Sequence, residues 1–338
     1  MTLLVRLDPE QLVEEAIEQA ASIIRRGGLV AFPTETVYGL GADATSEAAV
    51  RKIFEAKGRP ADNPVIIHVC GREMLDAVSE RVSEKARLLA DRFWPGPLSL
   101  VLERNSKIPP AVSGGLKTVA VRMPRCRIAL DLIRRAGTPV AAPSANISGR
   151  PSPTSALHVL DDLDGRIDMI LDGGTTEIGV ESTVLDITTD RALILRPGWI
   201  TREQLSEVIG PVHEAATDDE FKRSPGTRHP HYRPTARVVL VEGATERMLS
   251  KLLEGYLVNG RVGFIGHTET RVSGSGFDVV RIGDDAEDYA RLIYAALRQL
   301  DERGAQVVVV EGISDTGEGA AVMDRLRRAA SEIVANPS

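Results

Sequence analysis

The sequence predicts a two-domain protein of the α/β class. Its 338 residues exceed the usual size of one domain, and short apolar runs alternate with amphipathic segments along the chain. One polar, proline-rich stretch interrupts this alternation, so we expect a larger domain over residues 1–212, a linker over 213–236 and a smaller domain over 237–338. Irregular strand–helix order indicates a twisted mixed sheet in the first domain. Regular alternation indicates a parallel sheet, covered on both faces, in the second.

The first domain is expected to begin with a helix. Asp8 is placed to cap it, with Pro9 in the first helical position, and the helix is expected to end at Gly27. Short apolar runs predict buried strands at residues 29–32, 65–69, 98–102, 119–123, 139–142 and 169–171, then a hairpin at 184–187 and 193–195. Helical periodicity, with Ser46 as a cap, predicts helices at residues 46–57, 82–93, 128–135 and 154–160.

The linker is polar and follows neither the period of a strand nor that of a helix. In the second domain, apolar runs predict strands at residues 237–241, 261–265, 277–282 and 306–310. Helices are expected at residues 245–258, 285–302 and 320–334. Either Asp284 or Asp285 would cap the middle one.

Composition narrows the range of functions. The formal net charge is −7 and aromatic residues make up 4%, so generic polyanion binding and stacking on nucleic-acid bases are not expected as the main activity. Cys70 and Cys126 form neither a CxxC pair nor a cluster with zinc spacing, which fits a reducing compartment. The N-terminus lacks a signal-peptide pattern, and no apolar run approaches the roughly 18 residues of a membrane span. We expect a cytoplasmic protein without membrane association.

The segment FPTETVYGLGAD, residues 32–43, places polar side chains directly after a predicted buried strand. Ligand sites of open α/β sheets lie beyond the carboxyl ends of strands, so Thr34, Thr36 and Tyr38 are candidates for binding a small polar molecule. The alternative is a polar turn whose glycines supply positive φ angles. The sequence does not decide between the two.

The segment KGRPADNP, residues 57–64, places two cations close together at the end of a predicted helix. Lys57 and Arg59 suit a polyphosphate, because Arg binds it as a planar fork and Lys as a point charge. The alternative is that both cations complement the helix C-terminus, a contribution of about 0.3–1 kcal/mol. His68, on the following strand, is either a ligand or a satisfied core histidine.

Arg122 lies inside an apolar strand, between Val121 and Met123. An unpaired charge there would be very costly, so Arg122 needs an anionic partner. A substrate carboxylate bound by two N–H groups is one candidate, and an internal Asp or Glu is the other. Both remain open at the level of sequence.

A long turn over residues 141–154 is dense in Ser, Asn, Gly and Pro. Small residues let a ligand approach the backbone, and Ser144, Asn146 and Ser152 could contact phosphate or ribose. The alternative is a polar loop that caps the following helix.

Taken in order, these segments resemble the threonylcarbamoyl-AMP synthase family, also called YrdC-like. The match spans roughly residues 29–199 and includes FPTETVYGLGADA, KGRPADNP, WPGPLSLVL, APSANISGRPSPT, ESTVLD and LRPG. Further along, SPGTRHPHYRPTA and AVMDRLRRAA are similar to the long, two-domain branch of that family. The resemblance implies a YrdC-like first domain and a Rossmann-like second domain.

The resemblance further implies a nucleotidyl transfer that joins L-threonine, bicarbonate or CO₂, and ATP into threonylcarbamoyl-AMP and pyrophosphate. Mg²⁺ would be held by the ATP phosphates, with no metal ligand from protein side chains. The product would serve the threonylcarbamoyladenosine modification of tRNA next to the anticodon. A separate tRNA threonylcarbamoyl transferase complex would accept it.

The resemblance also implies roles for individual residues. Positions that match the site for L-threonine and bicarbonate are Thr34, His68, Arg122, Ala142 through its backbone, and Ser182. Positions that match the ATP site are Lys57, Arg59, Asn63, Thr118, Ser144, Asn146, Ser152, Arg196 and Tyr232. Of these, Lys57 and Arg59 are the expected catalytic pair on the phosphate side. We expect residues 224–235 to form a lid that Tyr232 closes over the nucleotide.

Two other functions fit part of the sequence. Arg51, Lys52, Lys57 and Arg59 form a local basic patch that could contact tRNA or double-stranded RNA, a role that strongly salt-dependent RNA binding would favour. Alternatively, the second domain could respond to ATP without turnover, as a regulatory nucleotide sensor. Release of pyrophosphate would separate an enzyme from such a sensor.

Overall fold

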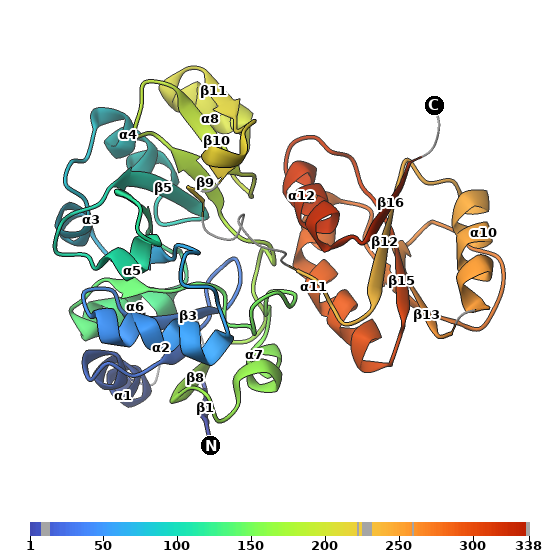
Figure 1. The fold of residues 1–338 in the computed structure, drawn as a ribbon, viewed down its shortest axis with the longest axis horizontal. Helices are drawn as coiled ribbons and strands as arrows, with labels where there is room; N and C mark the ends of the chain where they lie inside the picture. The colour runs from blue at the N-terminus through green and yellow to red at the C-terminus, as the bar shows by residue number, and fades with distance from the viewer. Residues whose placement is uncertain (8–13, 222, 225–231, 259, 336–338) are drawn as a thin grey trace. The chain divides into compact units, whose positions relative to one another are not determined.

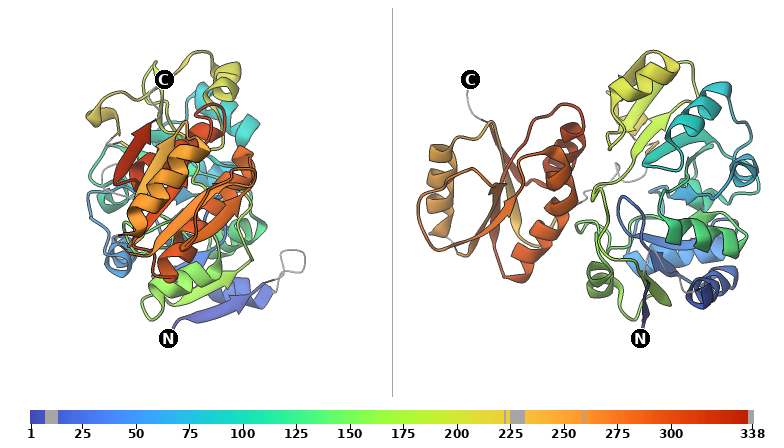
Figure 2. Two further views of the ribbon diagram at one scale, coloured as in Figure 1. Left: turned by 90° about the vertical axis from the view of Figure 1, so that its right-hand side faces the viewer. Right: turned by 180° about the vertical axis from the view of Figure 1, so that it is seen from behind.

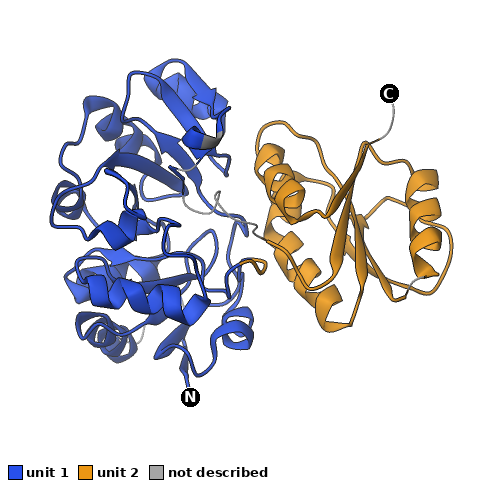
Figure 3. Cartoon of the chain, in the orientation of Figure 1, with its two compact units in different colours: residues 1–148, 152–229 blue, residues 149–151, 230–338 orange. Residues whose placement is uncertain are grey.

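The computed structural model describes residues 1–7, 14–221, 223–224, 232–258 and 260–335. The chain divides into two compact units (Figure 3). The first comprises residues 1–148 and 152–229, and the second comprises residues 149–151 and 230–338. Each unit has its own sheet and its own hydrophobic core.

The first unit is built on a mixed sheet, as the sequence predicts (Figure 1). Among the described residues its eleven strands lie in the order β1-β8-β2-β3-β7-β4-β6-β5-β9-β10-β11. Their bounds are β1 (Leu3–Arg6), β2 (Val30–Phe32), β3 (Gly39–Asp43), β4 (Ile66–His68), β5 (Leu98–Glu103), β6 (Thr118–Arg122), β7 (Val140–Ala141), β8 (Met169–Asp172), β9 (Thr183–Asp186), β10 (Ala192–Arg196) and β11 (Val212–Glu214). Strand β6 pairs parallel with β4 and antiparallel with β5.

Helices pack on both faces of this sheet. Their bounds are α1 (Glu14–Arg25), α2 (Glu47–Lys57), α3 (Arg72–Val78), α4 (Glu84–Phe93), α5 (Pro110–Ser113), α6 (Arg127–Ala136), α7 (Ala156–Leu163), α8 (Arg202–Ile209) and α9 (Asp218–Phe221). On one face, Val30 and Phe32 of β2 join the core formed with α1 and α6. On the other face, Ala31 joins the core that contains Val50 and Ile53 of α2. Burial on both faces explains why β2 is apolar at every position.

Local capping signals set the ends of several helices. Ser46 accepts a hydrogen bond from the backbone N–H of Ala49 and caps α2, as predicted. Gly58 ends the same helix in the left-handed conformation, with a φ of 60°. Ser155, rather than Thr154, caps α7, so the predicted start of that helix was too early.

Two glycines that were expected in a turn lie in a strand. Residues Gly39–Asp43 form β3, which pairs antiparallel with β2. Their glycines do not adopt positive φ angles. Instead, a Cβ added to Gly41 would lie 2.7 Å from the ring of Phe32 and 2.8 Å from the side chain of Val140. Close packing, not turn geometry, therefore requires glycine at this position.

The first unit contains several short strands and helices that the sequence did not predict. Strand β1 and helices α3, α5 and α8 were not predicted. The predicted helix start at Asp8 and Pro9 lies outside the described residues, and α1 is described from Glu14. The segment expected as an irregular linker begins inside β11, which pairs with β10, and contains the single turn of α9.

The second unit has a parallel sheet, as predicted. Among the described residues its five strands lie in the order β14-β13-β15-β12-β16, and all pairs are parallel. The strands are β12 (Arg237–Glu242), β13 (Val262–His267), β14 (Phe277–Ile282), β15 (Val307–Glu311) and β16 (Glu332–Ala335). The helices are α10 (Glu246–Leu257), α11 (Ala286–Glu302) and α12 (Gly319–Ala329). Helix α10 covers one face of the sheet, and α11 and α12 cover the other (Figures 1 and 2).

The last predicted helix was too long. Helix α12 ends at Ala329, and Glu332–Ala335 form β16 at the edge of the sheet beside β12. Exposure alternates along β16, and its centre is the β-branched pair Ile333 and Val334. Helical periodicity cannot reveal that β12 offers unpaired backbone groups to this segment.

Candidate active site

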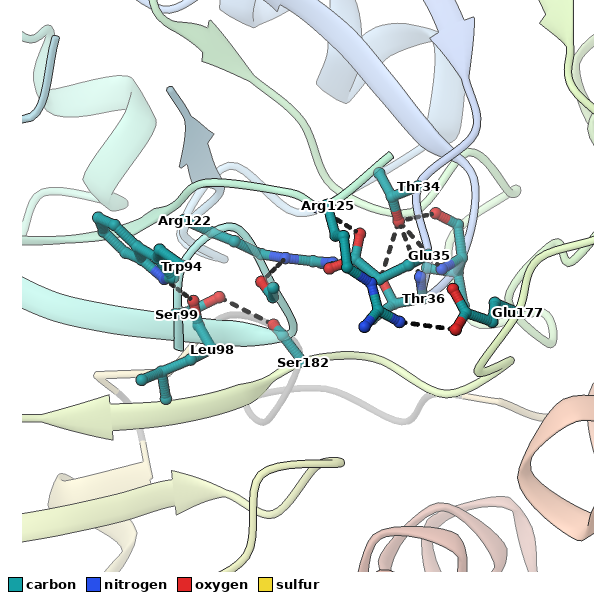
Figure 4. A network of polar contacts seen from close by, with 12 residues as sticks. Thr34, Glu35, Thr36, Trp94, Leu98, Ser99, Arg122, Arg125, Glu177 and Ser182 are labelled. Atoms are coloured by element: carbon teal, nitrogen blue, oxygen red, sulfur yellow. Dashed lines mark hydrogen bonds and ion pairs between the residues drawn. The ribbon is translucent and has the colours of Figure 1, made fainter. Parts of the chain in front are cut away.

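The turn between β2 and β3 is closed by its own hydroxyl groups (Figure 4). Thr34 and Thr36 are buried, and their hydroxyl oxygens lie 2.8 Å apart. The Thr34 hydroxyl also lies 2.7 Å from the carbonyl of Val37, to which it donates. The backbone N–H groups of Thr36 and Val37 donate back to that hydroxyl at 3.2 and 3.3 Å. These contacts fix the turn at the carboxyl end of β2 and hold Glu35 in the interior.

Arg122 is the last residue of β6, and three contacts hold its guanidinium (Figure 4). Nε donates to the carbonyl of Gly96 at 3.1 Å, and Nη1 donates to the hydroxyl of Thr36 at 2.8 Å. Nη2 lies 2.7 Å from Oε1 of Glu35, and the two side chains of this ion pair are 4% and 2% exposed. The anionic partner that this buried cation needs is therefore present within the protein. A guanidinium has more N–H groups than these contacts use, so donors remain for a ligand.

His68 lies beside Arg122 because β4 and β6 are parallel neighbours whose last residues are in register. Its buried ring packs edge-on against Phe32, with centroids 6.1 Å apart. Burial, together with the charge of Arg122, lowers the pKa of His68 to about 3, so the ring is neutral near pH 7. Nδ1 is buried without a hydrogen-bond partner among the described residues. The Nδ1 of this neutral ring is therefore available to a ligand.

Ser182 contacts both Ser99 and Arg196 within the first unit. Its hydroxyl lies 2.8 Å from that of Ser99 in β5 (Figure 4). Arg196, at the end of β10, donates to the Ser182 carbonyl at 3.2 Å from Nε and 3.0 Å from Nη2, and to its hydroxyl at 3.2 Å. Ser99 was not among the residues predicted from the sequence. Its position in an otherwise apolar strand was the signal that could have identified it.

The expected phosphate-side cations are both buried. The Lys57 side chain ends at the loop after β7, where Nζ donates to the carbonyls of Ser144, at 2.5 Å, and Asn146. Arg59 donates from Nη2 to the carbonyl of Pro64 at 2.8 Å, and from Nε to that of Asn63 at 3.3 Å. Lys57 thus brings the end of α2 together with the polar loop. In this structure both cations contact backbone carbonyls.

The polar loop after β7 is ordered by internal hydrogen bonds. The Ser144 hydroxyl donates to Oδ1 of Asn146 at 2.6 Å, and that side chain donates from Nδ2 to the carbonyl of Ile147. The Ser152 hydroxyl donates to Oε1 of Glu181 at 2.5 Å. Glu181 is buried and was not singled out from the sequence. Its place directly before Ser182 in ESTVLD was the available signal.

Among the described residues, three other predicted ones, Ala142, Thr118 and Tyr38, make no side-chain hydrogen bond or ion pair with Arg122, His68 or Ser182. Ala142 is buried, and its backbone N–H donates to the carbonyl of Ile66 at 2.9 Å. Thr118 opens β6 and Arg122 ends it, so they lie at opposite ends of a strand about 13 Å long. The buried Tyr38 hydroxyl donates to the carbonyl of Gly174 at 2.6 Å, and burial raises its pKa. Tyr38 is thus engaged within the fold.

Tyr232 belongs to the second unit. Its ring stacks on Tyr294 of α11 with centroids 5.6 Å apart, and the guanidinium of Arg325 lies 5.6 Å from the ring centre. Tyr232 has a φ of 67°, an uncommon value for a residue other than glycine. Residues 225–231 of the predicted lid lie outside the described residues.

Other potential sites are absent from the described part of the chain. It contains no group of three or more His, Cys, Asp and Glu side chains that could hold a metal ion. No helix described has the length and apolar character needed to cross a membrane. Cys70 and Cys126 are both free thiols.

Family models match both parts of the chain. The model described as Telomere recombination, which covers the Sua5, YciO and YrdC proteins, matches residues 22–198. The model described as the C-terminal domain of threonylcarbamoyl-AMP synthase matches residues 200–331. These matches confirm the resemblance carried by the sequence motifs.

Individual proteins resemble the chain over nearly its full length. The threonylcarbamoyl-AMP synthase of Pyrococcus abyssi is 48% identical over 97% of this chain and 98% of its own length. That of Bacillus subtilis is also 48% identical, over 93% of this chain and 92% of its own length. The crystal structure of P. abyssi Sua5 complexed with L-threonine has a TM-score of 0.94 at 46% identity, covering 99% of this chain and 100% of that one. The chain therefore belongs to the threonylcarbamoyl-AMP synthase family, whose members are enzymes of the nucleotidyl-transferring class.

Proposed function

We propose that the chain synthesises threonylcarbamoyl-AMP from L-threonine, bicarbonate or CO₂, and ATP, and releases pyrophosphate. The observation that carries this proposal is Arg122, a buried cation that three contacts hold in one orientation beside a neutral His68. A cation fixed in this way can bind a carboxylate with little further ordering. The P. abyssi relative, whose structure contains L-threonine, supports an amino acid as the ligand.

On the amino-acid side, Arg122 would bind the carboxylate of L-threonine. His68 and Ser182 would contact its other polar groups, and Thr34 and the backbone of Ala142 would complete the site. L-threonine would bind as the zwitterion, and its ammonium group would then lose a proton to solvent. The neutral amine attacks CO₂ and releases a second proton, or attacks bicarbonate and releases water, and either route gives a carbamate. A carbamate oxygen then attacks the α-phosphate of ATP, and pyrophosphate leaves. This sequence of steps needs no protein nucleophile, so positioning and charge stabilisation can supply the catalysis.

On the nucleotide side, the buried cations Lys57, Arg59 and Arg196 fit a polyphosphate, and they would stabilise the charge that develops on it. In this proposal the ATP phosphates carry Mg²⁺, which offsets part of their negative charge. Removal of one such donor is expected to raise the activation free energy by roughly 3–4 kcal/mol, by analogy with oxyanion-hole donors. The remaining nucleotide contacts are proposed for Asn63, Thr118, Ser144, Asn146, Ser152 and Tyr232.

The proposal also assigns a role to each part of the chain. Residues 1–212 would form the catalytic domain, 213–236 the linker and 237–338 the C-terminal domain. A carbamoylated adenylate hydrolyses readily, so residues 224–235 would act as a lid that excludes water, with Tyr232 over the nucleotide. Deletion of residues 225–231 should abolish net synthesis. Unchanged synthesis after this deletion would refute the lid.

The product would be passed to a separate tRNA threonylcarbamoyl transferase complex in the cytoplasm, for modification of the adenosine next to the anticodon. Direct RNA binding is the weaker alternative, because the expected basic patch is not intact at the surface. Arg51 and Lys52 are exposed, and Arg51 pairs with Glu47 at 2.6 Å, whereas Lys57 and Arg59 are buried.

Release of pyrophosphate from ATP and bicarbonate, with and without L-threonine, tests the proposal, and L-serine serves as the control substrate. We expect release that depends on threonine and that Arg122→Ala abolishes. If ATP binds but no amino acid stimulates release, the proposal fails. That outcome would favour a nucleotide sensor.

A further inference from the structure

Glu35 and Arg122 form an ion pair inside the proposed threonine site. Oε1 of Glu35 lies 2.7 Å from Nη2 of Arg122, and both side chains are almost fully buried. Oε2 accepts a hydrogen bond from the backbone N–H of Arg125 at 3.1 Å. A buried ion pair is weak evidence for a stabilising role, because removing two charges from water is costly. The charge of Glu35 therefore calls for a functional explanation.

The other titratable groups near this pair are neutral or lie at the surface. Burial, together with the guanidinium of the pair, lowers the pKa of His68 to about 3. Burial raises the pKa of the Cys126 thiol, so both groups are uncharged near pH 7. The side chain of Arg125 is 52% exposed and pairs with Glu177, which is 65% exposed. Within the buried pair, the charge of Glu35 cancels that of Arg122.

We propose that Glu35 cancels the charge of Arg122 in the amino-acid pocket and thereby selects zwitterionic amino acids over carboxylates that lack an α-ammonium group. This inference rests on the function proposed above and adds a specificity-determining residue to it. A zwitterion brings no net charge into the pocket. An anion of the same shape would leave one buried negative charge uncompensated, which is strongly unfavourable.

Replacement of Glu35 by Gln should reverse this preference. The charge of Arg122 would then lack its partner, and a bound anion would neutralise it, whereas a zwitterion would not. (R)-3-hydroxybutyrate differs from L-threonine only by the missing ammonium group. The affinity for L-threonine relative to this anion is expected to fall roughly tenfold to a thousandfold, the range over which one neighbouring opposite charge shifts an ionisation equilibrium.

Isothermal titration calorimetry on the full chain near neutral pH tests this expectation with L-threonine and (R)-3-hydroxybutyrate. Glu177→Gln is the matched control, because it makes the same carboxylate-to-amide change at the exposed ion pair. We expect Glu35→Gln to shift the preference, Glu35→Asp to keep it, and Glu177→Gln to leave it unchanged. An unchanged preference in Glu35→Gln, with L-threonine still bound, would overturn the inference and leave the proposed function intact.

A measurement on the unaltered protein decides the matter if thermal unfolding shows that Glu35→Gln does not fold. Calorimetry on the unaltered protein should show tighter binding of L-threonine than of (R)-3-hydroxybutyrate. Equal affinity for the two ligands would contradict the role of Glu35. If the unaltered protein does not bind L-threonine at all, the proposed function itself fails.

Discussion

Two ion pairs close to the site have the same N–O distance but differ in their surroundings. Arg122 and Glu35 lie 2.7 Å apart in the interior, and Arg125 and Glu177 also lie 2.7 Å apart at the surface. Water screens the exposed pair, which leaves about 0–1 kcal/mol for it. In the interior, the loss of one partner would leave the other charge uncompensated. Burial, rather than distance, therefore decides what each pair contributes.

The largest effect is expected when the buried pair is broken. Arg122→Ala leaves the carboxylate of Glu35 without its cation, and this should lower the free energy of unfolding by about 3–5 kcal/mol. Arg125→Ala, the corresponding change at the surface, should lower it by no more than about 1 kcal/mol. Urea denaturation followed by circular dichroism measures both. Equal losses would show that burial does not separate the two pairs.

Removal of both buried charges sharpens the comparison. A double variant, Arg122→Met with Glu35→Leu, leaves no uncompensated charge, and such replacements are often neutral or stabilising. We expect it to regain most of the stability that Arg122→Ala loses, about 2–4 kcal/mol on the same scale. The same denaturation experiment tests this. A double variant no more stable than Arg122→Ala would assign the loss to packing instead of charge.

His68 shares the buried environment and should make stability depend on pH. Its pKa is about 3 in the folded protein, below the usual value of about 6.5, so the unfolded chain binds more protons between these values. Above about pH 6.5 the neutral ring costs no stability. As the pH falls below that value, the free energy of unfolding decreases, and the decrease reaches about 2 kcal/mol at pH 5. Urea denaturation at pH 7 and pH 5 measures this decrease. The decrease should be present in the unaltered protein and absent in His68→Gln. The exposed His213 provides the control, since His213→Gln should retain it.

The smallest effect is expected for a neutral contact. Ser99→Ala removes the buried hydroxyl contact with Ser182. This loss should lower the free energy of unfolding by about 1 kcal/mol. Thr189 donates its exposed hydroxyl to the carbonyl of Arg191, and Thr189→Ala should cost less than Ser99→Ala. Thermal unfolding can rank the two variants. A greater loss at Thr189 would contradict the view that burial sets the scale.

Sequence patterns predicted most of the sheet because buried strands are short apolar runs, a local property. Strand β3 was missed because its two glycines look like turn residues, and the need for close packing against Phe32 and Val140 appears only in the folded chain. Strand β16 was missed because its partner, β12, lies far away in the sequence. Elements that depend on a distant neighbour were the ones that local patterns could not define.

By itself, the sequence determined two α/β units, the mixed and parallel character of their sheets, and a set of motifs sufficient to identify the family. It also showed that Arg122 needs an anionic partner. Only the tertiary structure decided that this partner is Glu35, and that Lys57 and Arg59 are buried against backbone carbonyls. The physical reason is that periodicity and motifs are local, whereas charge pairing and the exclusion of water depend on segments that only folding brings together.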